Sequence, residues 1–188
     1  MEGRELPLSR AVTVVALFAA LYCVFSLATA YIPTGPFFIQ FRPAIAIPMI
    51  AALLYPPLIA GLSAAIGTFI ASIIRYGSPL LTIFSGTPAN FLGFYVMSLV
   101  YYMLRKRRGV NWILALIISS LIGLFIGSII IAVGLWFLAL TLVPELASFK
   151  SLDFAIQASL ILVYAPAPIA IIIVIGVIKV LMKMGYME

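Results

Sequence analysis

The sequence predicts an all-α integral membrane protein, with one domain over residues 1–188 and six transmembrane helices in one bundle. Composition is the first observation: 65% of the residues are hydrophobic and only 9% are charged, against about 45–50% apolar and about 25% charged residues in soluble domains. The second is that the apolar residues form runs of about 20 or more, which is the length of a spanning helix. No polar stretch is long enough to form a second domain.

The expected helices follow these runs and the prolines that interrupt them. The first run ends at Ala28-Thr29-Ala30, which is compatible with signal-peptidase cleavage. It is longer than the apolar part of a signal peptide, so a retained helix is favoured. The stretch 43–74 is too long for one helix, and Pro56-Pro57 divides it into two short helices or a re-entrant hairpin. Pro166 and Pro168 predict a kink in the last helix. The predicted helices are 11–32, 43–54, 58–74, 79–104, 112–142 and 154–182.

Basic residues predict that both chain ends lie in the cytoplasm. Three basic residues fall on the outer side: Arg42, Arg75 and Lys150. Eight fall on the inner side: Arg4, Arg10, Arg105, Lys106, Arg107, Arg108, Lys179 and Lys183. This distribution follows the positive-inside rule. If residues 43–74 formed one span, the cluster at 105–108 would face outward, so the number of crossings is expected to be even.

Several classes of function are disfavoured by residues that the chain lacks. Histidine is absent and Cys23 is the one cysteine, so an intrachain disulfide is impossible and no metal site or cofactor is expected. The chain has no GxxxxGK[ST] loop for ATP hydrolysis. None of its five acidic residues lies in the middle of an apolar run, which disfavours a proton-coupled carrier. We therefore do not expect an enzyme. Nucleic-acid binding is not expected either, because the basic residues are scattered at the ends of apolar runs and form no cluster on a polar surface.

Aromatic and hydrogen-bonding residues gather on the predicted outer side. The candidate binding residues are Phe38, Gln40, Arg42, Arg75, Tyr76, Asn90, Trp136 and Gln157. Such a mixture suits a pocket for a small, partly aromatic molecule, although an interfacial aromatic belt has a similar composition. Asn90 requires a hydrogen-bond partner, which a neighbouring helix backbone could also supply. Arg42 and Arg75 either reach lipid phosphates or converge on an anionic ligand group.

Small residues recur at the spacing that lets membrane helices approach closely. The pairs are Ala16-x-x-x-Ala20, Gly61-x-x-x-Ala65, Gly67-x-x-x-Ala71 and Gly123-x-x-x-Gly127. Ordinary packing within the bundle accounts for most pairs of this kind.

Over most of its length the chain resembles the substrate-binding S components of energy-coupling factor (ECF) transporters. The resemblance rests on three segments: Ala16-Leu17-Phe18-Ala19-Ala20-Leu21, then Phe41-Arg42-Pro43-Ala44 through Leu53-Leu54-Tyr55-Pro56-Pro57-Leu58-Ile59-Ala60-Gly61, and Pro88-Ala89-Asn90-Phe91-Leu92-Gly93. One departure is Gly67-Thr68, where many members carry Gly-Asp, so the resemblance names no substrate.

The resemblance implies a subunit that binds a vitamin or related metabolite near the outer surface of a prokaryotic cytoplasmic membrane. It implies docking through Ala16 and Ala20 to a membrane T component that carries two ATPases, and a lid formed by residues 33–42. The proposed transport step in the family is a toppling of the S component. Flavin, thiamine, biotin, a corrin precursor and a queuosine precursor all remain open as substrates. The alternatives are a stand-alone carrier or channel, or a membrane scaffold that transports nothing.

Overall fold

The computed structural model describes residues 6–29, 42–107 and 109–185, and all of the regular secondary structure in these ranges is helical. Seven α-helices are joined by short 3₁₀ and π segments. In chain order the elements are α1 (Leu8–Thr29), the 3₁₀ turn η1 (Pro43–Ile45), α2 (Ala46–Leu54), α3 (Pro57–Tyr76), the π segment η2 (Thr82–Gly86), α4 (Thr87–Arg105), α5 (Trp112–Thr141), the 3₁₀ segment η3 (Pro144–Lys150), α6 (Leu152–Tyr164) and α7 (Ala167–Lys183).

Prolines set the breaks between these helices. Tyr55 is extended and Pro57 begins α3, because proline is well suited to the first turn of a helix, where its missing N–H costs nothing. The predicted division of residues 43–74 is therefore confirmed. At the other end of the chain, the expected kink is a break between α6 and α7 at Ala165 and Pro166.

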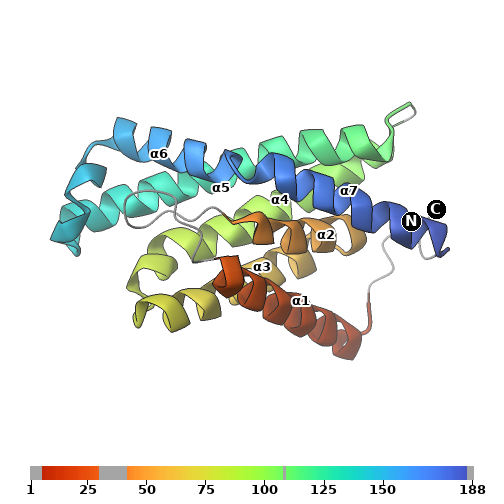
Figure 1. The fold of residues 1–188 in the computed structure, drawn as a ribbon, viewed down its shortest axis with the longest axis horizontal. Helices are drawn as coiled ribbons and strands as arrows, with labels where there is room; N and C mark the ends of the chain where they lie inside the picture. Colours follow the sequence, from red (N-terminus) through yellow and green to blue (C-terminus); the bar gives the residue numbers. More distant parts are fainter. Residues whose placement is uncertain (1–5, 30–41, 108, 186–188) are drawn as a thin grey trace.

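Five helical segments are long and apolar enough to cross a membrane, whereas Pro43–Leu54 is shorter. The all-helical membrane fold is thus confirmed, and a sixth crossing depends on this shorter helix. The start of α1 and the end of α7 lie at the same end of the bundle (Figure 1). That arrangement agrees with an even number of crossings; the cytoplasmic placement of both ends stays a prediction.

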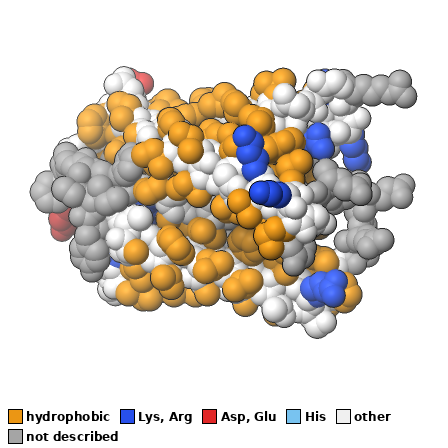
Figure 2. All heavy atoms as spheres, turned by 45° about the vertical axis from the view of Figure 1, so that its right-hand side comes forward, with side chains coloured by type: hydrophobic (Ala, Val, Ile, Leu, Met, Phe, Trp, Pro, Cys, Tyr) orange, Lys and Arg blue, Asp and Glu red, His pale blue; other side chains and the backbone are white. Residues whose placement is uncertain are grey.

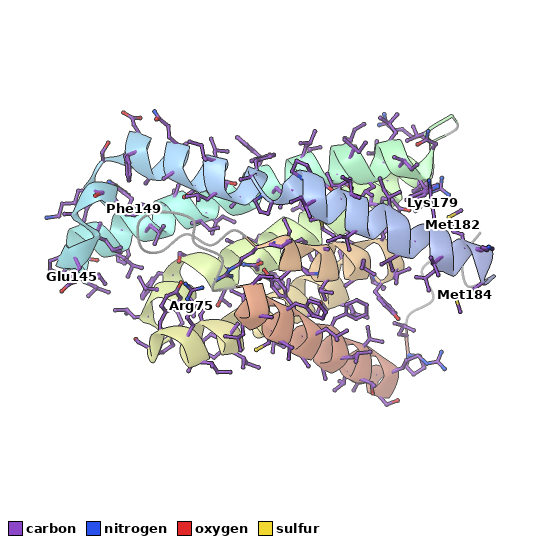
Figure 3. The ribbon with its side chains drawn as sticks, in the orientation of Figure 1. Arg75, Glu145, Phe149, Lys179, Met182 and Met184 are labelled. Carbon is purple, nitrogen blue, oxygen red and sulfur yellow. The ribbon has the colours of Figure 1, made fainter. Side chains whose placement is uncertain are left out.

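Charge is distributed unevenly along the bundle. Hydrophobic side chains cover the middle of the surface, while the lysines and arginines visible in Figure 2 gather toward the end where α1 begins. We call this the basic end; it carries Arg105, Lys106, Arg107 and Lys183 from the ends of α4 and α7. Figure 3 places Lys179 and Met184 toward it and Glu145 and Phe149 at the opposite end.

Glycines allow the central helices to pack with their backbones nearly in contact. A Cβ atom at Gly123 of α5 would meet the Gly93 carbonyl oxygen of α4, and one at Gly67 of α3 would lie 2.7 Å from the Ala19 carbonyl oxygen of α1. Gly61 approaches the backbone of Phe91 in the same way. Each of the three small-residue pairs that contain glycine therefore places a glycine at a close contact between two helices, as expected.

Most of the buried apolar residues of the described chain belong to two separate clusters. The larger joins α2, α3, α4, α5 and α7 on the side of the basic end and includes Met49, Met97 and Leu116. The smaller joins α5, η3 and α6 at the opposite end and includes Leu138 and Leu146. A cavity occupies the space between them.

Candidate functional site

The cavity is partly open and is lined by residues from α1, η1, α3, η2, α4, α5 and α6. Its volume is about 160 Å³; on the same measure a single water needs about 10–15 Å³. Both clusters contribute to its wall, Met97 and Leu124 from the larger and Leu135 from the smaller. The polar residues in the wall are Tyr22, Arg42, Thr68, Ser72, Tyr76, Thr82, Ser85, Asn90 and Ser159. The site therefore has room and hydrogen-bonding groups for a small organic molecule.

One wall of the cavity is the π segment that precedes α4. Pro88 has no N–H to bond the carbonyl of Phe84 one turn earlier. The N–H of the preceding residue, Thr87, donates to the Thr82 carbonyl five residues earlier, which is the spacing of a π-helix. The hydroxyls of Thr82 and Thr87 lie 2.8 Å apart. Gly134 of α5 accommodates the widened turn, because a Cβ there would collide with the Phe84 carbonyl. Segments of this kind are frequent at functional sites.

Asn90 is held in a defined orientation by two hydrogen bonds. Its Nδ2 donates to the Gly86 carbonyl at 2.7 Å, and its Oδ1 accepts from the Tyr22 hydroxyl at 2.9 Å. The partner that the sequence required is thus the backbone of its own segment together with a phenol from α1. Since both Tyr22 and Asn90 line the cavity, this contact ties the first helix to the cavity wall.

Two hydroxyl groups in the wall have no hydrogen-bond partner among the described residues. Thr68 and Ser159 are 1% and 2% exposed, and within the described part of the chain neither the Thr68 Oγ1 nor the Ser159 Oγ is hydrogen-bonded. An unsatisfied buried polar group costs about 1–3 kcal/mol. Ser26 of α1 is a third such residue, but it does not line the cavity.

The structure brings three of the predicted binding residues to the cavity: Arg42, Tyr76 and Asn90. Arg75 is exposed at the end of α3, with its guanidinium carbon 5.4 Å from the centre of the Tyr76 ring (Figure 3). Trp136 packs against the smaller apolar cluster and Gln157 is exposed on α6; neither lines the cavity.

The remaining two predicted residues, Phe38 and Gln40, lie outside the described residues, as does the expected lid except for Arg42. Sequence reasoning did not select Tyr22, Thr68, Ser72 or Ser159 as binding residues, although all four line the cavity. Tyr22 carried a usable signal, because a phenol in the middle of an apolar helix needs a partner. An isolated Ser or Thr carries no comparable signal, since its hydroxyl can bond to its own helix.

The described wall contains one charged residue, Arg42, and no carboxylate. Among the described residues there is also no group of three or more His, Cys, Asp or Glu side chains able to hold a metal ion. The local charge therefore favours an uncharged or negatively charged occupant over a cation.

The predicted docking residues occupy the opposite face of α1 from the cavity. Ala16 and Ala20 are exposed, whereas Ala19, Tyr22 and Cys23 are buried against the bundle. Ala16 and Ala20 therefore lie at the surface, unlike Gly67 of α3 and Gly123 of α5, which pack against neighbouring helices.

A multi-pass helical membrane protein with a partly polar cavity among its helices has the structure expected of a solute-binding transport protein. The family model for the substrate-specific component of ECF transporters matches residues 10–186, and the chain belongs to this family. The recognition made from the sequence is thereby confirmed. Members of this family are transport-related substrate-binding proteins. Searches of curated proteins and of solved structures gave no match.

Proposed function

We propose that this chain captures a vitamin or related small metabolite at the outer face of a prokaryotic cytoplasmic membrane. A membrane T component and two cytoplasmic ATPases then act with the chain to deliver the molecule. The observation that supports the proposal most strongly is the cavity. The wall includes the last turns of α3 and the first turn of α4, and these lie far from the basic end, where α4 finishes and α5 begins.

The packing between the cavity and the basic end supports a capture subunit over a stand-alone channel or carrier. Between the cavity and the basic end lies the larger apolar cluster, in which Met49, Ala115 and Leu116 are completely buried. A continuous route through the bundle would have to pass through this packed region. Release toward the cytoplasm therefore requires a movement of the whole subunit or of its helices, which is consistent with dependence on a separate energising module.

The exposure of Ala16 and Ala20 supports the proposal that a partner helix binds to this face of α1. Small side chains allow close approach of another helix within lipid. A scaffold that transports nothing could use the same face, but it has no need of a polar cavity elsewhere in the chain.

Uptake measurements test this proposal. Cells that produce the chain with a T component and both ATPases should accumulate the molecule that co-purifies with the chain, as identified by mass spectrometry. Cells that lack the ATPases should not. Equal accumulation with and without the ATPases would favour the stand-alone carrier.

A further inference from the structure

The unpartnered hydroxyls of Thr68 and Ser159 differ from other buried hydroxyls in the same bundle. Ser63, Ser119 and Ser128 each donate to a carbonyl of their own helix, at 3.0, 3.1 and 2.8 Å. This is the usual way to satisfy a hydroxyl group inside a helix. Thr68 and Ser159 make no such bond, although both lie within helices. Both residues line the cavity, although the two oxygens themselves are buried, so a molecule there would reach them once the side chains turn toward it.

The two residues belong to different parts of the bundle. Thr68 is on α3, which packs against α1 and α4, while Ser159 is on α6, which packs against α5. Apolar side chains such as Phe94, Ile131 and Leu162 complete the wall. An occupant that satisfies both hydroxyls thus needs polar groups at two positions and an apolar body between them.

The distribution of acidic residues determines which charge the occupant can carry. Glu145 and Asp153 are exposed and do not line the cavity. The other three acids, Glu2, Glu5 and Glu188, are terminal in the sequence, and residues 30–41 contain no Asp or Glu. Moving an ion from water into a protein interior without a counter-charge costs several kcal/mol. An organic cation would pay this cost beside Arg42, whereas an uncharged molecule would not.

We propose that the cavity selects a small amphipathic molecule without positive charge, and that Thr68 and Ser159 are specificity-determining residues that hydrogen-bond it at two separate points. This inference rests on the proposed capture function and narrows its substrate class. Among the vitamins and precursors that the family fold could serve, it excludes organic cations and free metal ions.

The test uses full-length protein in detergent and the low-molecular-mass fraction of yeast extract as the probe. Wild-type protein and the single variants Thr68→Val, Ser159→Ala and Ser26→Ala are incubated with this fraction, separated from unbound molecules by gel filtration, and denatured. The released molecules are quantified by mass spectrometry, and their charge at neutral pH is determined by electrophoresis. Ser26→Ala is the matched control, because it removes a buried unpartnered hydroxyl that lies outside the cavity.

We expect the wild type and Ser26→Ala to release equal amounts of an uncharged or anionic molecule. Thr68→Val and Ser159→Ala should each release roughly tenfold less of this molecule than the wild type, or less still, which is the loss typical of one hydrogen bond to a ligand. Release of a cation or metal ion by the wild type would overturn this inference and leave the proposed capture function intact. Equal retention by all four proteins would overturn the roles of Thr68 and Ser159. If no protein, the wild type included, releases a bound molecule, both the inference and the capture function fail.

Discussion

Near the basic end of the bundle, hydroxyl groups join helices, whereas around the cavity some hydroxyl groups have no partner in the described part of the chain. Ser98 donates to the Tyr55 carbonyl at 3.1 Å and Tyr102 to the Leu53 carbonyl at 3.3 Å, so α4 is fastened to the α2–α3 junction. At the cavity, Thr68 and Ser159 are buried but have no hydrogen-bond partner among the described residues. Hydroxyl groups therefore connect helices in the first region, whereas these two hydroxyls of the second region do not.

The helix α4 also changes its geometry along the bundle, although glycines keep it close to α5 throughout. Close to the middle of the bundle, Gly93 and Gly123 bring α4 and α5 into backbone contact. Toward the cavity end, the π segment widens α4, and Gly134 is needed to keep α5 packed against it. The predictions below test whether these differences separate a cytoplasmic, cohesive region from an outward-facing, ligand-binding region.

The largest expected effect concerns the sides of the membrane on which the two regions lie. Single cysteines in place of Arg107 and Lys150, in a Cys23→Ala background, should react with an impermeant maleimide from opposite sides. Both native side chains are exposed, and the positive-inside rule places Arg107 in the cytoplasm. Labelling of the two positions from the same side would mean that α5 does not cross the membrane and would refute the six-span fold.

Changes on the exposed face of α1, which carries Ala16 and Ala20, should affect assembly and leave ligand binding unchanged. Replacement of both Ala16 and Ala20 by Trp should abolish co-purification with a T component, because bulky side chains prevent close helix contact. Substrate affinity should stay at the wild-type level, since neither residue lines the cavity. Ile172→Trp on α7, at a residue that is 69% exposed, is the control and should assemble normally. Lost binding with intact assembly would reverse this assignment.

Stability should show how tightly the π segment is packed. Gly134→Ala should lower the free energy of unfolding by about 3 kcal/mol or more, the upper part of the range for overpacking, because its Cβ would meet the Phe84 backbone. Gly176→Ala on α7 is the matched control: no atom lies within 4 Å of its Cβ, and alanine favours helices. Thermal unfolding in detergent should separate the two variants, and equal melting temperatures would contradict the contact.

Much of the fold could be predicted from the sequence, because apolar runs and proline positions determine where membrane helices begin and end. The break at Pro56-Pro57 and the one near Pro166 are clear examples. The π segment was missed: Pro88 lies within a helical run, and nothing in the sequence shows that a widened turn replaces an ordinary kink.

The candidate site was predicted less completely, because a side chain's direction depends on helix rotation. Gln157 and Ser159 are two residues apart on α6, which is a rotation of about 200°. The prominent amide is exposed and the small hydroxyl lines the cavity. Helix rotation separates Arg75 from Tyr76 in the same way: Arg75 is exposed, and Tyr76, the next residue, lines the cavity. Residue type alone could not decide between such neighbours.

The most direct test of the account is isothermal titration with the molecule released from the wild-type protein, applied to two asparagine variants. Asn90→Ala removes the amide that lines the cavity and leaves the Tyr22 hydroxyl without its partner, so affinity should fall by roughly one to two orders of magnitude. Asn111→Ala removes the amide that accepts from the Leu114 N–H at the start of α5, near the basic end, so it should lower stability slightly and leave affinity unchanged. Wild-type affinity in Asn90→Ala would contradict the claim that this cavity is the site of substrate capture.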